Sequence, residues 1–84
     1  MTLYMKTKKF TITAIGKHRL DILNRISALY LQKQIPVESI AFEETEKGKG
    51  KYQIVCCTSE EDSIKRIVNQ ICNIVDISKA SYKI

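Results

Sequence analysis

The sequence predicts an α+β domain with the element order βαββαβ, in which two helices cover one face of a four-stranded antiparallel sheet. Two observations predict this fold. Extended segments rich in β-branched residues alternate with segments whose apolar residues recur at helical spacing. A polar turn that contains two glycines also joins the second and third extended segments, as in a β-hairpin. The chain has 84 residues, a length that suits one domain.

The first half of the chain predicts a strand followed by a helix. Residues 10–15 alternate and are rich in β-branched side chains, which predicts a strand that residues 16–18 end. An apolar stripe then predicts a helix over residues 19–33. Its members are Leu20, Leu23, Ile26, Leu29 and Tyr30. Pro36 cannot continue a helix and favours extended geometry before it, so the helix should end near Gln34.

The second half predicts a hairpin, a helix and a last strand. Residues 37–45 and 51–57 are the predicted hairpin strands, with residues 46–50 as the turn. Ser59 can cap the second helix, and the acidic residues after it favour the positive end of the helix dipole. The apolar stripe of this helix follows the i, i+3, i+4, i+7 pattern. It consists of Ile64, Ile67, Val68 and Ile71. Residues 75–84 are the predicted last strand.

These elements predict a ferredoxin-like arrangement whose edge strands are the second and the fourth. We expect residues 1–8 to be an N-terminal lead-in and residues 9–84 to form the single domain. Alternation leaves two choices for the core-facing side of the second strand. One choice is Glu38, Ile40 and Phe42, and the other is Val37, Ser39 and Ala41. Many unrelated functions use this fold, so fold alone does not identify the function.

Composition narrows the class of protein. The apolar fraction is 44%, which is ordinary for a globular chain. No apolar run is long enough to span a membrane and the N-terminus lacks a signal-peptide pattern, so we expect a cytoplasmic protein without membrane contact. The cysteines Cys56, Cys57 and Cys72 have no metal-like spacing, which favours reduced structural thiols.

The net charge of +5 permits attraction to nucleic acid or to an acidic protein surface. RNA-binding modules of this fold stack bases on aromatic residues of the first and third strands. Phe10 and Tyr52 are the only aromatic residues on those strands, and either one could belong to the core. The small number of aromatic residues on these strands therefore argues against nucleic-acid binding, although the net charge favours it.

The sequence offers little for catalysis. The only histidine, His18, lies near Asp21 in the predicted loop, and this single pair is a weak signal for an oriented base. Small phosphatases of the same fold cradle an acyl phosphate in this loop, but Gly16 is the only glycine there to ease such a turn. We therefore expect no catalytic residue, no metal site and no cofactor in this chain.

Two segments resemble the ACT domain of the acetolactate synthase (acetohydroxyacid synthase) small subunit. The first combines Leu23-Asn24-Arg25-Ile26 with Pro36-Val37-Glu38-Ser39-Ile40, and the second is Val75-Asp76-Ile77. The resemblance covers about residues 9–82. It implies a non-catalytic regulatory subunit of the short, single-domain type. Such a subunit binds and activates a thiamine-diphosphate-dependent large subunit of branched-chain amino-acid biosynthesis, and often relays inhibition by valine.

The resemblance also implies an amino-acid effector site, which this sequence alters. The candidate effector residues are Gly16, His18, Arg19, Leu20, Asp21, Pro36 and Val37. His18 stands where the family has asparagine, Asp21 replaces a glycine that admits the ligand carboxylate, and Pro36 replaces another asparagine. These substitutions argue against a valine site of the usual kind. A rearranged site, in which Arg19 or His18 receives an anion, stays open.

We expect a homodimer in which the second strand pairs with its mate, since that strand is a predicted edge. The predicted interface residues are Val37, Ser39, Ile40, Ala41 and Phe42. The leading hypothesis is a regulatory subunit that docks on the acetolactate synthase large subunit. The alternatives are a stand-alone ACT sensor of amino acids that acts on another protein, and an RNA-binding module. The sequence leaves the effector and the docking surface unidentified.

Overall fold

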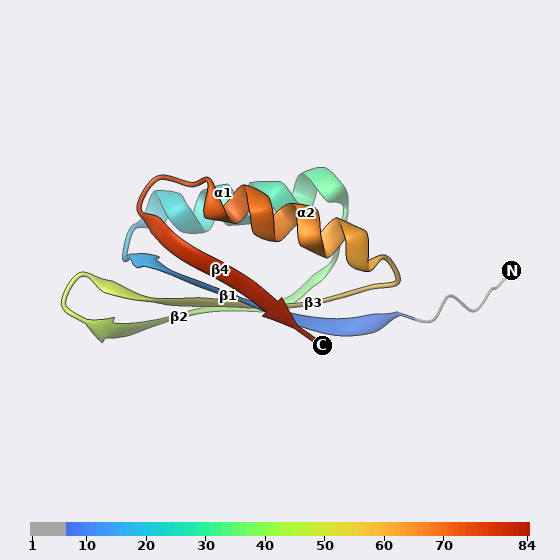
Figure 1. Cartoon of the computed structure of the whole chain (residues 1–84), viewed down its shortest axis with the longest axis horizontal. Helices are drawn as coiled ribbons and strands as arrows, with labels where there is room; N and C mark the ends of the chain where they lie inside the picture. Colours follow the sequence, from blue (N-terminus) through green and yellow to red (C-terminus); the bar gives the residue numbers. More distant parts are fainter. Residues whose placement is uncertain (1–6) are drawn as a thin grey trace, which may run out of the picture.

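The structure, a computed structural model, describes residues 7–84, which form one antiparallel sheet with two helices on one face (Figure 1). The elements are β1 (Lys8–Lys17), α1 (Leu20–Lys33), β2 (Val37–Glu46), β3 (Lys49–Thr58), α2 (Glu61–Cys72) and β4 (Ile77–Lys83). The sheet order is β2-β3-β1-β4. The predicted element order, the antiparallel sheet and the two edge strands are therefore confirmed. The predicted lead-in lies outside the described residues, except that Thr7 is described and Lys8 begins β1.

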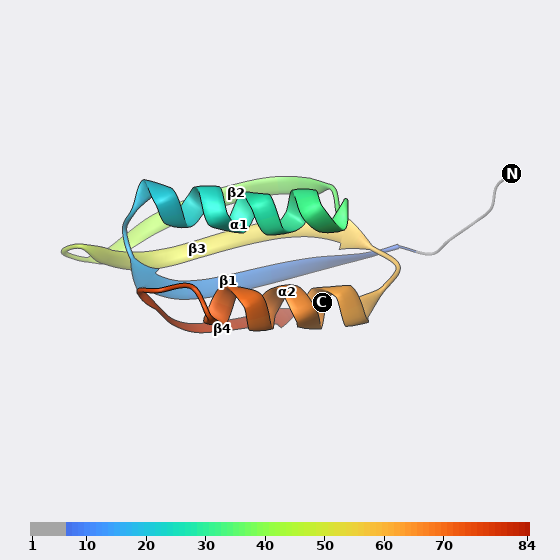
Figure 2. The same cartoon turned by 90° about the horizontal axis from the view of Figure 1, so that it is seen from above.

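The core lies between the sheet and the helices. In Figure 2, α1 lies over β2 and β3, whereas α2 lies over β1 and β4. The two central strands bury every second side chain toward the helices, as alternation requires. The fully buried side chains of this layer include Phe10, Ile12, Ile22, Ile26, Tyr52, Ile54, Cys56, Ile64, Ile67 and Ile71. No helix of the described chain covers the other face of the sheet, which we call the open face (Figures 1 and 2).

Strand β1 is longer than predicted, because Gly16 and Lys17 continue it instead of ending it. The Lys17 amide donates a hydrogen bond to the Asp76 carbonyl (3.0 Å), which holds the end of β1 against the turn before β4. Gly16 is buried there, and a Cβ at this position would meet the Asp76 carbonyl oxygen. The glycine thus permits close approach of two backbones within a strand.

The hairpin turn is shorter than predicted. β2 extends to Glu46 and β3 begins at Lys49, so only Lys47 and Gly48 form the loop. Gly48 has φ of 76°, a conformation that suits glycine. Its amide donates to Glu44 Oε2 at 3.0 Å, which gives the turn a local partner. The two hairpin strands can therefore pair almost to the tip.

The ends of the helices follow local hydrogen-bond geometry. At the end of α1, Gln34 adopts a left-handed conformation (φ 58°), and Ile35 donates its amide to the Tyr30 carbonyl at 3.1 Å. This is a Schellman cap with glutamine in the usual glycine position. The prediction that Ser59 caps α2 is wrong. The helix begins one residue later, and Glu60 occupies the N-cap position without a side-chain cap.

Strand β4 is shorter than predicted and covers Ile77–Lys83. Asp76 precedes it with φ of 75°, so the chain turns sharply there instead of extending from Val75. The backbone of this turn is fixed on one side by the bond from Lys17 and on the other by the bond from the Ile77 amide to the Ile74 carbonyl (3.1 Å).

Neither predicted face of β2 is right, because a β-bulge interrupts the alternation between Val37 and Ser39. Val37 lies opposite Cys56, and Ile40 lies opposite Ile54, so both face the helices. Phe42 faces the same way. Glu38, Ser39 and Ala41 lie on the open face.

Candidate functional site

Most of the predicted effector residues lie in residues 16–21, which we call the β1–α1 loop although they include the end of β1 and the start of α1. One phenol anchors this segment. The Tyr52 hydroxyl donates a hydrogen bond to the Lys17 carbonyl (2.6 Å) and accepts one from the Arg19 amide (3.1 Å). The His18 amide donates to the Gly48 carbonyl at 3.1 Å, and the Lys17 amide donates to Asp76. Three consecutive loop amides therefore bond within the chain, which leaves them unavailable to a ligand carboxylate.

Arg19 is bound by two carboxylates. Its Nε lies 3.0 Å from Asp21 Oδ1, and its terminal nitrogen lies 2.8 Å from Asp76 Oδ2. Hydrogen bonding to Asp21 and then to Asp76 raises the pKa of the guanidinium above its usual value. Lys17 lies 3.5 Å from the other oxygen of Asp76. The sequence left open a site in which Arg19 receives an anion. Such an anion would have to displace Asp21 and Asp76 from the guanidinium.

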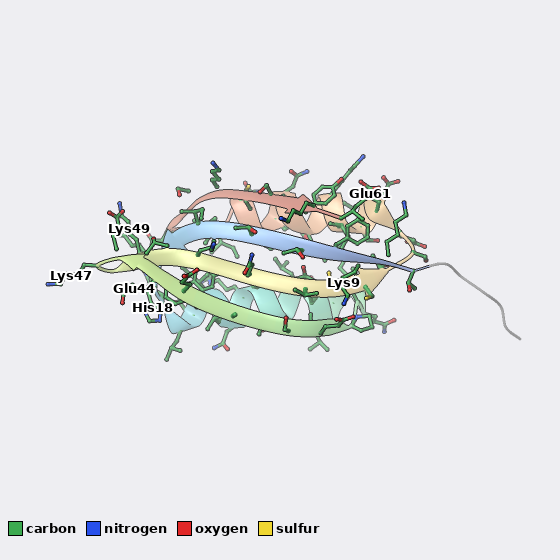
Figure 3. All side chains as sticks on the ribbon, turned by 90° about the horizontal axis from the view of Figure 1, so that it is seen from below. Lys9, His18, Glu44, Lys47, Lys49 and Glu61 are labelled. Carbon is green, nitrogen blue, oxygen red and sulfur yellow. The ribbon has the colours of Figure 1, made fainter. Side chains whose placement is uncertain are left out.

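His18 packs as an aromatic ring. Its imidazole stacks on Phe42 with ring centroids 4.0 Å apart and planes 17° apart, and Phe42 contacts the Tyr52 ring at 4.8 Å. Figure 3 shows His18 at the same end of the sheet as the hairpin residue Glu44. The Asp21 carboxylate is bound to Arg19. The pair of His18 with Asp21 that we considered for acid–base chemistry is therefore not formed.

The predicted effector residues do not all come together in one chain. Gly16 is buried, while Leu20 begins α1 with 77% of its surface exposed. Pro36 and Val37 follow the other end of α1, and a 14-residue helix spans about 21 Å. The structure thus groups the loop residues and separates Pro36 and Val37 from them.

A groove lies on the outer side of α1 where it meets the edge strand β2. This apolar groove has a volume of about 330 Å³ and is lined by Ser27, Tyr30, Leu31, Ile35, Val37 and Ile40. Leu31 is 80% exposed, and Val37 and Ile40 are each 39% exposed. Of the predicted interface residues, Val37 and Ile40 border the groove, Phe42 is half-buried, and Ser39 and Ala41 face the open side.

A second polar cluster on the open face was not predicted from the sequence. The Cys57 thiol donates to Glu38 Oε2 at 2.9 Å, and Lys9 lies 3.2 Å from Glu38 Oε1. The hydrogen bond from Cys57, together with Lys9, lowers the pKa of Glu38. The same carboxylate raises the pKa of the Cys57 thiol, which makes it a poorer nucleophile. Only strand register could have revealed this cluster, because its members are far apart in sequence.

The geometry does not supply a base-stacking platform on the open face. Phe10 and Tyr52 are 1% and 0% exposed and point toward the helices. Within residues 7–84, no group of three or more metal-binding side chains is positioned to hold an ion. In the same part of the chain, no helix has the length and apolarity required to cross a bilayer.

Comparison with known proteins identifies the fold. No protein-family model matches the sequence, and no curated protein matches it either. Among solved structures, the ACT domain of GTP pyrophosphokinase from Chlorobium tepidum superimposes with a TM-score of 0.77 over 93% of this chain and 100% of that one, at 9% identity. The chain has the ACT fold.

Other proteins of quite different size contain this ACT fold. The acetolactate synthase small subunit of Thermotoga maritima matches with a TM-score of 0.72 at 13% identity, over 89% of this chain and 47% of that one. A homoserine dehydrogenase from Thiobacillus denitrificans matches with a TM-score of 0.75 at 11% identity, over 93% of this chain and 17% of that one. At such identities the similarity concerns the fold alone.

Proposed function

We propose that this chain is a non-catalytic regulatory subunit that binds and activates the large subunit of a cytoplasmic acetolactate synthase. The observation that carries the proposal is the ACT fold, shared with the acetolactate synthase small subunit of Thermotoga maritima. The two sequence segments that resemble this family add to it. The first lies in α1 and at the start of β2, and the second lies at the turn into β4. In this role the chain needs no cofactor of its own.

The proposal includes activation that does not respond to valine in the usual way. The Arg19 guanidinium and the loop amides already bond within the chain. A carboxylate ligand would have to break these contacts and would also approach the charge of Asp21. We therefore expect the β1–α1 loop to be a structural joint rather than an effector site.

We also propose a homodimer that pairs β2 of one chain with β2 of its mate. Leu31, Val37 and Ile40 support this proposal, because their exposed apolar surfaces flank an edge strand with free backbone groups. Two-fold antiparallel pairing would set the start of one β2 beside the end of the other. Since His18 stacks on Phe42 in the second half of β2, the mate's Pro36 would approach this loop.

The dimer is tested with two matched substitutions. Ile40→Asp places a charge on the groove, whereas Val75→Asp places one on the turn before β4, where Val75 is 75% exposed. Sedimentation velocity should show a dimer for the wild type and for Val75→Asp, and a monomer for Ile40→Asp. A wild-type chain that remains monomeric at high concentration would remove the dimer proposal.

The regulatory role is tested by acetolactate synthase activity of the cognate large subunit, with and without this chain. Each assay is repeated with valine, leucine or isoleucine. A rise in activity that no amino acid reverses would support the proposal. Reversal by valine would show that the loop opens to a ligand. If the chain neither binds nor activates the large subunit, the amino-acid sensor becomes the better hypothesis. A thermal-shift screen tests that hypothesis, because a sensor should be stabilised by its amino acid.

A further inference from the structure

The centre of the open face bears mostly short side chains. Residues of this face are identified by register, because the buried residues of β1 point to the helices and their neighbours in sequence point away. Its central side chains are Thr11, Thr13, Ser39, Ala41, Gln53, Val55 and Ser81. Figure 3 shows this face from below, with the helices behind it. A surface of this kind can accept another protein surface without steric obstruction.

Most of the positive charge of the chain lies outside the helices. The acidic residues of the helices and their N-caps are Asp21, Glu60, Glu61 and Asp62, and the basic residues are Arg19, Arg25, Lys33, Lys65 and Arg66. These two groups leave a net charge of +1. The remaining +4 of the net charge of +5 therefore belongs to the strands, their loops and the N-terminus.

Four lysines gather on the open face at the end of the sheet that carries the hairpin. Lys51 and Lys79 flank Ile15 from the two neighbouring strands, and Lys17 lies directly opposite Lys49. We call these four residues the lysine cluster. Like charges directly opposite each other destabilise a sheet, so an anionic partner would relieve this arrangement.

Only part of the lysine cluster is neutralised within the chain. Lys51 lies 3.6 Å from Glu43, and Lys17 lies 3.5 Å from Asp76. Within the described part of the chain, Lys49 and Lys79 form no ion pair with a carboxylate, although Glu46 is the register partner of Lys49. These two ammonium groups are exposed and available to an external anion.

We propose that the open face docks on an acidic surface of a partner protein, with the partner's carboxylates on Lys49 and Lys79. A second copy of this chain packed face to face with the hairpin ends together is a poor occupant, because the two lysine clusters would oppose each other. Nucleic acid is also a poor occupant, because among residues 7–84 no aromatic side chain lies on the open face for bases to stack on. The identification of this partner as the regulated enzyme subunit rests on the proposed function.

The first test uses labelled poly-L-glutamate as a probe of carboxylate binding, measured by fluorescence anisotropy at low salt. The double variant Lys49→Gln/Lys79→Gln is compared with Lys65→Gln/Arg66→Gln, which removes the same charge from the exposed side of α2. We expect the open-face variant to bind about tenfold more weakly and the α2 variant to bind nearly as the wild type does. Equal losses in both variants, or tighter binding of single-stranded oligouridylate than of polyglutamate, would overturn the proposal.

The second test uses the acetolactate synthase large subunit and the same two variants. Affinity measured by calorimetry should fall only for the open-face variant, and the wild-type affinity should decrease with added salt. Sedimentation should show the same oligomeric state for both variants, because the groove beside β2 is unchanged. Wild-type binding that both variants retain would refute docking through the open face. If the wild type does not bind the large subunit yet passes the polyglutamate test, the proposed function fails and the acidic-surface inference stands.

Discussion

The Tyr52 hydroxyl is the most informative single group in the β1–α1 joint, and its removal gives a quantitative test. Tyr52→Phe keeps the buried ring and deletes the hydrogen bonds of the hydroxyl to the loop, of which the two shortest are 2.6 Å and 3.1 Å. A partly buried carbonyl and amide then lose their partner, which costs about 1–3 kcal/mol. For a domain of this size, a loss of about 2 kcal/mol lowers the melting temperature by about 8–16 °C.

Tyr30 provides the matched control. Its ring is also buried, at 2% exposure, but its hydroxyl contacts only the Cys56 thiol, at 3.7 Å, among the side-chain hydrogen bonds described. A thiol is a weak donor, so Tyr30→Phe should cost less than about 1 kcal/mol. Urea unfolding followed by circular dichroism measures both variants. Equal losses for the two tyrosines would refute the view that Tyr52 fixes the loop through its hydroxyl.

Three further predictions concern single positions. Gly16→Ala should destabilise the fold by about 1–3 kcal/mol, because the added Cβ meets the neighbouring backbone; a lower urea midpoint would show it. Gln34→Gly should stabilise the fold by about 1 kcal/mol, because glycine adopts the left-handed cap conformation without strain; an unchanged midpoint would contradict this. Since Glu38 raises the pKa of the Cys57 thiol, the thiol stays protonated to higher pH. Alkylation of Cys57 at pH 8 should therefore accelerate severalfold in Glu38→Gln, while Cys72 serves as the unchanged internal reference by mass spectrometry.

The fold could be predicted from the sequence because local patterns agree with the tertiary arrangement. Of the predicted α2 stripe, Ile64, Ile67 and Ile71 are buried and Val68 is partly buried, and the alternation of β1 buries every second side chain. The end of α1 was also predictable, since Pro36 forbids continuation, although the left-handed Gln34 was not. The errors in the extent of the elements lie at their boundaries, where one hydrogen bond decides which residue begins or ends an element.

The face of β2 could not be predicted, for a physical reason. Alternation assumes an unbroken ladder, and the bulge after Val37 changes the side on which each following residue lies. Only the register shows that the partly exposed Ile40 lies opposite the buried Ile54.

The ion pairs and hydrogen bonds of the candidate effector loop could not be predicted either. The sequence showed Arg19 beside Asp21, which left the guanidinium open to an external anion. The second carboxylate, Asp76, comes from 57 residues further along the chain. The joint therefore depends on a contact that only the folded sheet creates, and the same is true of the phenol of Tyr52.

The two edges of the sheet carry opposite charge, and this has a consequence for self-assembly. β2 bears Glu38, Glu43, Glu44 and Glu46, whereas β4 bears Lys79 and Lys83. A β2 edge of one molecule would thus attract the β4 edge of the next, and such head-to-tail addition has no natural end and produces filaments. Pairing of β2 with β2 brings two acidic edges together, so it must overcome their mutual repulsion. It leaves only lysine-bearing edges outside, which also repel each other. The closed dimer would in this way act as a terminator of polymerisation, and a chain unable to dimerise would be free to polymerise at low ionic strength.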